Sequence, residues 1–208
     1  MKKLKVASFF SGCGGSDLGI LGDFTFLNKT YKKLPFDICY AIDNDKYAVD
    51  TYNQNFEHPS ILGDIKNIDK STIPDFDVLI GGFPCQSFST VNPTKDTNDA
   101  RANLYRELVA IVNLKKPEYF VLENVKGLTT LKQGTILKRV IADFTNSGYK
   151  VRHKVLLASD FGIPQKRERV FIIGIRNDIE FDYEYPKETN TSSNWTPLKS
   201  VIDSLILN

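Results

Sequence analysis

The sequence predicts an α/β domain built on an open, mostly parallel, doubly wound sheet that closes with an antiparallel hairpin. Short apolar runs alternate with stretches of helical periodicity from end to end, which is typical of parallel sheets with helices on both faces. Turns rich in glycine, proline or acidic residues follow the apolar runs. The chain has 208 residues, of which 41% are hydrophobic, and this suffices for one packed core and excludes a disordered chain.

Each predicted strand is a short apolar run bounded by turn residues, and each predicted helix repeats apolar residues at helical spacing. The helix that starts near position 45 has Asn44 or Asp45 as its cap, and the last long helix ends at Gly148. The predicted parallel strands are residues 4–9, 36–42, 60–62, 77–81 and 119–122, the predicted helices are 17–27, 45–56, 103–114 and 130–146, and the closing hairpin pairs 151–157 with 170–175.

The pattern divides the chain into two regions. Residues 1–176 carry the strand–helix alternation and form the predicted main domain. From position 177 onward polar and aromatic residues replace that pattern, and 189–194 has the composition of a linker. A short helix with an apolar face is expected over 198–207, after Thr196 and Pro197, so 177–208 is predicted to be a linker followed by a short helix.

Charge and cysteine content narrow the class without deciding the function. The 27 basic and 25 acidic residues are mixed, which excludes a strongly basic arm or an acidic tail. The three cysteines have no C-x-x-C spacing and only two histidines accompany them, so neither a disulfide scaffold nor a metal site is expected. A reducing, cytoplasmic compartment is predicted.

The N-terminus leaves one alternative open. Lysines at positions 2, 3 and 5 precede a short apolar stretch that leads to Cys13, as in a lipoprotein leader. That stretch is at the minimum length for a signal peptide, and no run approaches the roughly 20 apolar residues of a membrane span. We therefore expect no membrane association.

Cofactor-binding chemistry is predicted where the first three strands end. The turn Phe10-Ser11-Gly12-Cys13-Gly14-Gly15 exposes backbone N–H groups after the first strand, although a plain tight turn would have the same composition. Asp43 ends the second strand, where a carboxylate can accept from a ribose diol. Asp64 ends the third strand, within reach of an adenine amino group. A nucleoside without phosphates, such as S-adenosylmethionine, fits these acidic residues.

Catalytic chemistry is predicted after the fourth and fifth strands. Cys85 lies in a Gly/Pro/Ser loop, where a reactive thiolate is favoured over a packing role, whereas Cys39 lies in an apolar strand. Glu123 at an apolar strand end suits a proton donor, with a surface helix-capping role as the alternative. Gln165, Arg167 and Arg169 alternate before the last strand and are expected to point the same way, unless they are a solvated charge run.

Together these segments resemble the DNA (cytosine-5)-methyltransferase family. The glycine turn resembles the cofactor loop, Asp43 the ribose ligand, and Gly63-Asp64-Ile65 the adenine contact. Phe83-Pro84-Cys85-Gln86 resembles the catalytic loop, Glu123-Asn124-Val125 the E-N-V signature, and Gln165-x-Arg167-x-Arg169 the Q-x-R-x-R signature. The signatures follow in family order over about residues 4–176. Asn44 departs from the bulky residue that often stands there, and the segment 21–34 is slightly longer than usual.

The resemblance implies a Rossmann-like fold and methyl transfer from S-adenosylmethionine to carbon 5 of a cytosine flipped out of duplex DNA, with S-adenosylhomocysteine as product. Cys85 would attack carbon 6, Glu123 would hold ring nitrogen 3, and Arg169 with Arg167 would fix the base, the phosphate or the loop. The implied catalytic residues also include Pro84, Gln86 and Asn124. The implied cofactor contacts are Phe10, Ser11, Gly12, Cys13, Gly14, Gly15, Asp43, Asn44, Asp64, Ile65, Pro84 and Leu104, and the implied DNA contacts are Gln86, Ser87, Ser89, Arg101 and Gln165.

The resemblance also implies a target-recognition domain and a last motif that this sequence does not contain. A fragment, a split gene whose second polypeptide supplies the rest, and a truncated relic all fit, so the chain alone is expected to methylate DNA poorly. Two other classes stay open. One is a binding module of the same fold that does no chemistry. The other is a cysteine hydrolase, which would need His58 or His153 as a base near Cys85.

Overall fold

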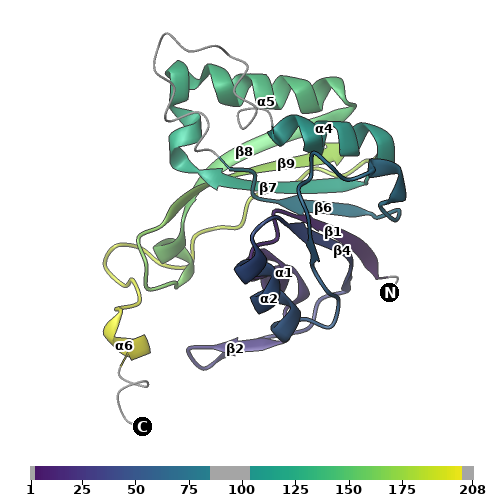
Figure 1. Ribbon diagram of the computed structural model, residues 1–208. Helices are drawn as coiled ribbons and strands as arrows, with labels where there is room; N and C mark the ends of the chain where they lie inside the picture. Colours follow the sequence, from purple (N-terminus) through teal and green to yellow (C-terminus); the bar gives the residue numbers. More distant parts are fainter. Residues whose placement is uncertain (1–2, 85–103, 203–208) are drawn as a thin grey trace.

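The fold is an open seven-stranded sheet flanked by helices, as seen in the computed structural model, which describes residues 3–84 and 104–202 (Figure 1). β1 pairs in parallel with β4 and β6, β4 with β5, and β6 with β7, whereas β9 runs antiparallel to β7 and β8. The predicted α/β class and the closing hairpin are confirmed. The strand order is β5 (Ile61–Leu62), β4 (Phe36–Asp43), β1 (Leu4–Phe9), β6 (Val78–Gly81), β7 (Tyr119–Val125), β9 (Glu168–Arg176), β8 (Tyr149–Leu157).

Helices cover the two faces of this sheet unequally (Figure 1). α4 and α5 lie over β6, β7, β9 and β8 on one face, where the main core packs around the fully buried Phe120, Leu122 and Phe144. α1 and α2 lie on the other face beside β1 and β4, over a smaller cluster that includes Val6 and Tyr52. The helices are α1 (Gly15–Leu21), α2 (Lys46–Asn55), α4 (Leu104–Lys115), α5 (Thr135–Asn146) and α6 (Lys199–Ile202), and the 3₁₀ turns are η1 (Lys70–Thr72), η2 (Lys126–Thr129), η3 (Leu131–Gly134) and η4 (Ala158–Phe161).

The prediction of a helix over 17–27 is wrong beyond Leu21. Gly22 ends α1 with φ +67°, and a hairpin of β2 (Phe24–Phe26) and β3 (Lys29–Tyr31) follows. Both central residues of its two-residue turn, Leu27 and Asn28, have positive φ, as a type I′ turn requires. Phe24 stacks on Tyr31 across the pair. Alternating aromatic and threonine side chains favour strands, and this signal outweighed the helical spacing.

Two further boundaries differ from the prediction. The helix expected over 130–146 begins only at Thr135, because Lys132 and Gln133 adopt left-handed backbone conformations that interrupt it. β7 continues to Val125, since β9 pairs with it along its whole length. Glu123 therefore lies inside a strand, and Asp43 likewise is the last residue of β4.

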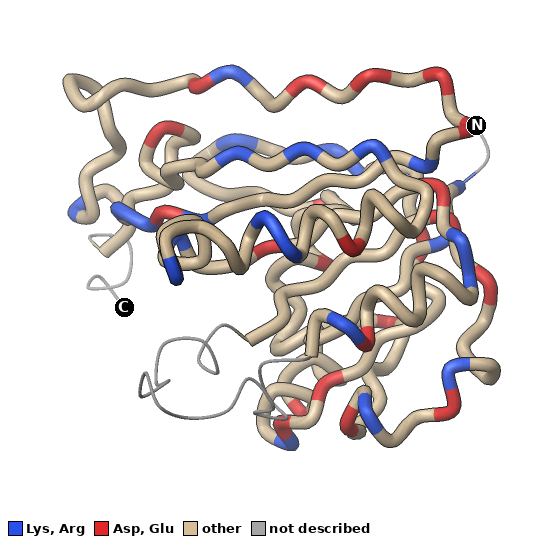
Figure 2. Tube along the Cα trace, turned by 90° about the horizontal axis from the view of Figure 1, so that it is seen from above, with Lys and Arg blue, Asp and Glu red and all other residues tan. Residues whose placement is uncertain are grey.

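The segment 177–188, called the strap below, runs alongside β8. Lys150 donates to the carbonyl of Ile179, Arg152 pairs with Asp182 at 2.7 Å, and Lys154 with Glu188 at 2.9 Å. Figure 2 shows the acidic residues of the strap beside the row of cations on β8. The short α6 lies within the helix expected over 198–207, of which the last residues lie outside the described part. Within the described part, no helix has the length and apolar content needed to span a bilayer.

Candidate functional site

Most of the residues predicted to bind the nucleoside of the cofactor line one cavity of about 280 Å³ at the carboxyl edge of the sheet. The strands end there side by side because they are parallel, so residues far apart in the chain become neighbours. Two of the lining residues, Ile42 and Lys66, were not predicted, although each adjoins a predicted one. The predicted residues that line it are Phe10, Asp43, Asn44, Gly63, Asp64, Ile65, Pro84 and Leu104.

Asp43 connects this cavity to the glycine turn. Its Oδ2 accepts the backbone N–H of Gly12 at 2.8 Å, and its Oδ1 accepts that of Asp45 at 2.9 Å. Each carboxylate oxygen has a second lone pair, so Asp43 can still accept from a ribose diol. The remaining residues of the predicted turn, Ser11, Cys13 and Gly14, line neither this cavity nor the one described next, whereas Gly15 lines the latter.

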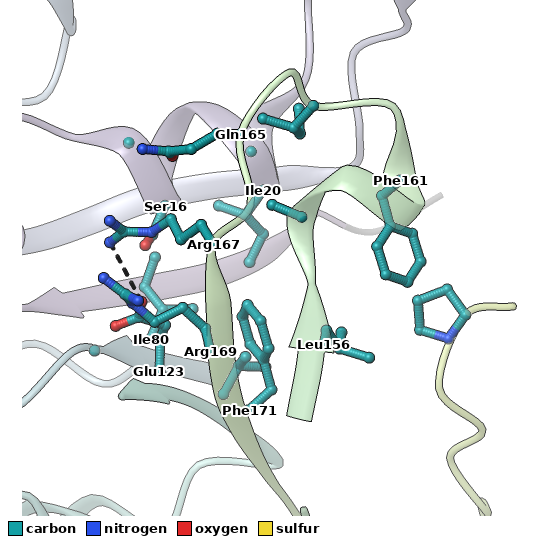
Figure 3. A pocket seen from close by; sticks show the side chains of 17 residues that line it. Ser16, Ile20, Ile80, Glu123, Leu156, Phe161, Gln165, Arg167, Arg169 and Phe171 are labelled. Carbon is teal, nitrogen blue, oxygen red and sulfur yellow. Dashed lines mark ion pairs between the residues drawn. The ribbon is translucent and has the colours of Figure 1, made fainter. Parts of the chain in front are cut away.

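A second cavity, of about 720 Å³, collects three predicted catalytic side chains: Glu123 of β7, Arg169 of β9 and Arg167 just before β9 (Figure 3). Arg169 Nε lies 2.7 Å from Glu123 Oε1, and Arg167 reaches the same oxygen at 3.7 Å. Gln165 lines the cavity with them. The alternation at 165, 167 and 169 is thus confirmed as a shared face, and the interpretation as a solvated charge run is excluded for Arg169, which is mostly covered.

Strand register explains this convergence. Along β7, Phe120, Leu122 and Asn124 are buried beneath α4 and α5, so Tyr119, Val121 and Glu123 face the other side. β9 places Phe171 opposite Glu123 and Arg169 opposite Val125. Glu123 and Arg169 are therefore diagonal neighbours on one face, a separation that long side chains bridge.

Asn124 faces away from the cavity. It is buried, and its Nδ2 donates to the carbonyl of Phe83 at 2.8 Å. Gly82 lies against Glu123, because a Cβ added at Gly82 would be 3.4 Å from Glu123 Oε2. The chain is thus anchored beside Glu123 where the predicted catalytic loop begins. The predicted Cys85, Gln86, Ser87, Ser89 and Arg101 lie outside the described residues.

The cavity around Glu123 has an apolar wall that the sequence did not predict. Its members come from α1, β8, η4 and the turn after it, β9 and the strap. Of these, only Phe171 had a signal in the sequence, the alternation along β9. This wall consists of Ile20, Leu156, Phe161, Ile163, Phe171 and Pro186.

Other candidate groups lie elsewhere. Cys39 Sγ donates to the carbonyl of Val6 at 3.4 Å, and burial raises the pKa of its thiol, as expected of a packing cysteine. His58 and His153 line neither cavity. Within residues 3–84 and 104–202, no three His, Cys, Asp or Glu side chains are grouped as metal ligands.

Comparison with known proteins agrees with this arrangement. The model of the C-5 cytosine-specific DNA methylase family matches residues 4–206. Type II methyltransferase M.NgoFVII of Neisseria gonorrhoeae is 38% identical over 202 residues, which are 96% of this chain and 51% of the relative. M.Bsp6I of Bacillus sp. (strain RFL6) is 41% identical over 176 residues, covering 84% of this chain and 53% of its own length.

Solved structures share the fold. The S. pombe Dnmt2 methyltransferase superimposes with a TM-score of 0.65 at 25% identity, covering 88% of this chain and 52% of its own. The chain spans about half the length of the curated relatives it matches. The ordered signatures, the convergence of Glu123, Arg167 and Arg169 on one cavity and the match over nearly the whole chain lead to one conclusion: this chain belongs to the C-5 cytosine-specific DNA methylase family.

Proposed function

We propose that this chain carries the catalytic part of an enzyme that transfers a methyl group from S-adenosylmethionine to carbon 5 of cytosine in duplex DNA. The observation that carries the proposal is the Glu123–Arg169–Arg167 cluster, held in a cavity at the same sheet edge as the nucleoside-sized cavity. By likeness to type II relatives, we assign it to DNA modification in the cytoplasm.

The smaller cavity fits the nucleoside part of S-adenosylmethionine. Asp43 would accept from the ribose hydroxyls and Asp64 from the adenine amino group, while Phe10, Ile65 and Leu104 offer apolar contact for the ring. Bound there, S-adenosylmethionine supplies an electrophilic methyl group. Conversion to S-adenosylhomocysteine by transfer of that methyl group leaves every one of these contacts intact, so both forms should bind.

The larger cavity fits a flipped cytosine. Carbon 5 of cytosine is a weak nucleophile, so Cys85 Sγ first bonds to carbon 6 as a thiolate. Glu123 holds or protonates ring nitrogen 3 and makes carbon 5 electron-rich. Arg169 fixes Glu123 and, with Arg167, the base or the loop. After methylation the proton on carbon 5 leaves to a base, and the electron pair released expels Cys85 Sγ.

We further propose that activity requires a segment outside these 208 residues, on the same or a second polypeptide, that carries the target-recognition function. We assign its docking place to an apolar groove on the sheet. The cavity around Glu123 continues into a third cavity of about 520 Å³, and the two share Ile20, Val121, Leu156, Phe171 and Pro186. Together they form the apolar groove, between α1 and the strap, on the sheet face that α4 and α5 do not cover.

The lining of the apolar groove suits an amphipathic helix. Its floor has apolar side chains of six strands, among them Val78, Tyr119 and Ile173, and its far wall has Phe181 and Tyr183 of the strap. Phe181 is 53% exposed, so the groove is open. An apolar surface of this extent is typical of an interaction site. The occupant would lie along the third cavity and leave the space around Glu123 to the cytosine.

Trapping with 5-fluorocytosine tests the function. Fluorine at carbon 5 cannot leave as the proton does, so the Cys85 adduct should persist. We would join this chain to the part of M.NgoFVII that lies outside the matched half, add S-adenosylmethionine and fluorinated duplex, and map the adduct by mass spectrometry. Adduct at Cys85 that is lost in Cys85→Ser supports the proposal. Absence of adduct with tight binding of S-adenosylhomocysteine would instead support the non-catalytic binding module.

A further inference from the structure

A carboxylate that takes no part in the proposed chemistry is buried behind the glycine turn. Asp17, in the first turn of α1, has no exposed surface. Its Oδ2 accepts from Ser8 Oγ on β1 at 2.9 Å, and its Oδ1 accepts from the Tyr52 hydroxyl on α2 at 2.9 Å. Burying a carboxylate is costly unless both oxygens are hydrogen-bonded. The two hydrogen bonds of Asp17 meet this requirement and connect α1 to both β1 and α2.

The residue that follows α2, Phe56, contacts the glycine turn itself. The Phe56 ring stacks on Tyr52 with centroids 4.4 Å apart. It also lies against Gly14, because a Cβ added at Gly14 would be 2.1 Å from Phe56 Cε2. Gly14 has φ +90°, so glycine is required there both for its backbone conformation and for the approach of the ring. Phe56 thus packs directly against the turn, and Tyr52 packs against Phe56 and hydrogen-bonds Asp17 of α1.

α1 needs such external support. It has seven residues, and its N-cap residue Gly14 has no side chain to cap the helix. Isolated helices of this length are unstable, because few hydrogen bonds offset the cost of nucleation. Asp17 supplies the missing anchor from the first turn of the helix. Burial raises the pKa of the Asp17 carboxyl, whereas the hydrogen bonds from Ser8 and Tyr52 lower it.

We propose that Ser8, Asp17 and Tyr52 form a positioning network that holds the turn from Gly12 to Gly15 in the conformation that receives the cofactor. The turn is then fixed from two sides, by Asp43 through the N–H of Gly12 and by the network through α1. None of the three residues lines the cofactor cavity, so they act through the turn. This inference rests on the proposed function, because it takes S-adenosylmethionine as the ligand of the turn.

Deletion of one hydroxyl group tests the network. We would compare Tyr52→Phe with Tyr149→Phe, in which the same group is lost from a buried tyrosine. Tyr149 donates to the carbonyl of Pro117 and pairs with Arg176 at the opposite edge of the sheet. Binding of S-adenosylhomocysteine to the purified 208-residue chain is measured by calorimetry, and stability by urea unfolding. Both variants should lose stability, but only Tyr52→Phe should weaken binding, by fivefold or more.

Ser8→Ala and Ser8→Thr provide a second arm should Tyr52→Phe fold poorly. Ser8→Ala should weaken binding, and Ser8→Thr, which keeps the hydroxyl, should restore it. A purely structural role predicts reduced stability with the dissociation constant of the folded protein unchanged within twofold, and that result would overturn the inference. Failure of the wild-type chain to bind S-adenosylhomocysteine at all would instead overturn the cofactor assignment, and the positioning role with it.

Discussion

Arg169 Nε lies 2.7 Å from Glu123 Oε1, between two strands that pair antiparallel, β9 and β7. On its other side β7 pairs in parallel with β6. β7 presents Glu123 away from the buried side of the sheet, and β9 returns in the opposite direction to place Arg169 one diagonal step away. A parallel neighbour would have placed its own carboxyl end there and the arginine at the far edge. The reversal of β9 therefore brings a cation to the edge where the strands present their functional residues.

Arg169→Lys should reduce methyl transfer about 10- to 100-fold, because lysine lacks the planar guanidinium that hydrogen-bonds a carboxylate. Arg167 would still pair with Glu123 at 3.7 Å, so the loss should not be complete. Binding of S-adenosylhomocysteine should stay unchanged, since Arg169 does not line the cofactor cavity. The rate of Cys85 adduct formation in the complemented enzyme measures the effect. Arg152→Lys is the matched control and should leave the rate unchanged, because Arg152 on β8 pairs with Asp182 of the strap. Equal rates for Arg169→Lys and wild type would contradict the role.

Asp43→Asn should weaken binding of S-adenosylhomocysteine about tenfold or more. The substitution keeps the shape but removes the charge that accepts the N–H groups of Gly12 and Asp45, and charged hydrogen bonds contribute roughly 1.5–3 kcal/mol. Calorimetry on the isolated chain gives the dissociation constant. Asp37→Asn, at the other end of the same strand, should leave it unchanged. If both substitutions weaken binding equally, Asp43 is not a specific ligand.

Phe181→Asp should prevent complementation by the second segment while binding of S-adenosylhomocysteine persists. Phe181 lines the third cavity and not the cavity around Glu123, and a carboxylate there would have to be buried by an apolar helix. Phe181→Leu keeps the apolar surface and should complement normally. Co-purification of the two segments measures the outcome, and undiminished assembly of the aspartate variant would place the docking surface elsewhere.

Gly174→Ala should destabilise the fold by at least about 2 kcal/mol, because strain from overpacking costs 1–3 kcal/mol or more. A Cβ at this position in β9 would lie 2.0 Å from Phe120 Cε1, and Phe120 is itself fixed by Phe144 and Tyr149. Urea unfolding measures the change. Gly19→Ala on α1, where no atom lies within 4 Å, is the control and should keep or slightly raise stability. An unchanged free energy of unfolding for Gly174→Ala would mean that β9 can shift to make room for the methyl group.

Stability should fall as the pH rises from about 10 toward 12. Burial raises the pKa of Tyr149 to about 12 from its ordinary value of 10.0. The folded state therefore holds this proton more tightly than the unfolded state does, so its contribution is complete below pH 10 and disappears as the pH passes the folded pKa. The loss should be about 2–3 kcal/mol. Urea unfolding at pH 9 and 11.5 measures it, and Tyr149→Phe should flatten that part of the profile. An unchanged profile in this variant would assign the decline to other tyrosines.

The sequence by itself predicted the class of the fold, the positions of the main strands along the chain and the common orientation of Gln165, Arg167 and Arg169 toward one cavity. These follow from local periodicity and from the turn residues that end each strand. The sequence also indicated Asp43 and Asp64 as candidate cofactor ligands, since each stands at or next to a strand end, and both line the smaller cavity. The hairpin at 24–31 escaped it, because its Phe24–Tyr31 stacking and type I′ turn compete locally with a helical pattern.

Only the tertiary structure decided which residues meet. The direction of Glu123 depends on Phe120, Leu122 and Asn124 being covered by α4 and α5, and its partner on the register of β9. The support of Gly14 by Phe56, the burial of Asp17 and the apolar groove beneath the strap likewise join segments far apart in the chain. Periodicity reports how one segment divides between core and surface. It carries no information on which other segment forms that core, so the contacts that shape the site appear only when the strands pair.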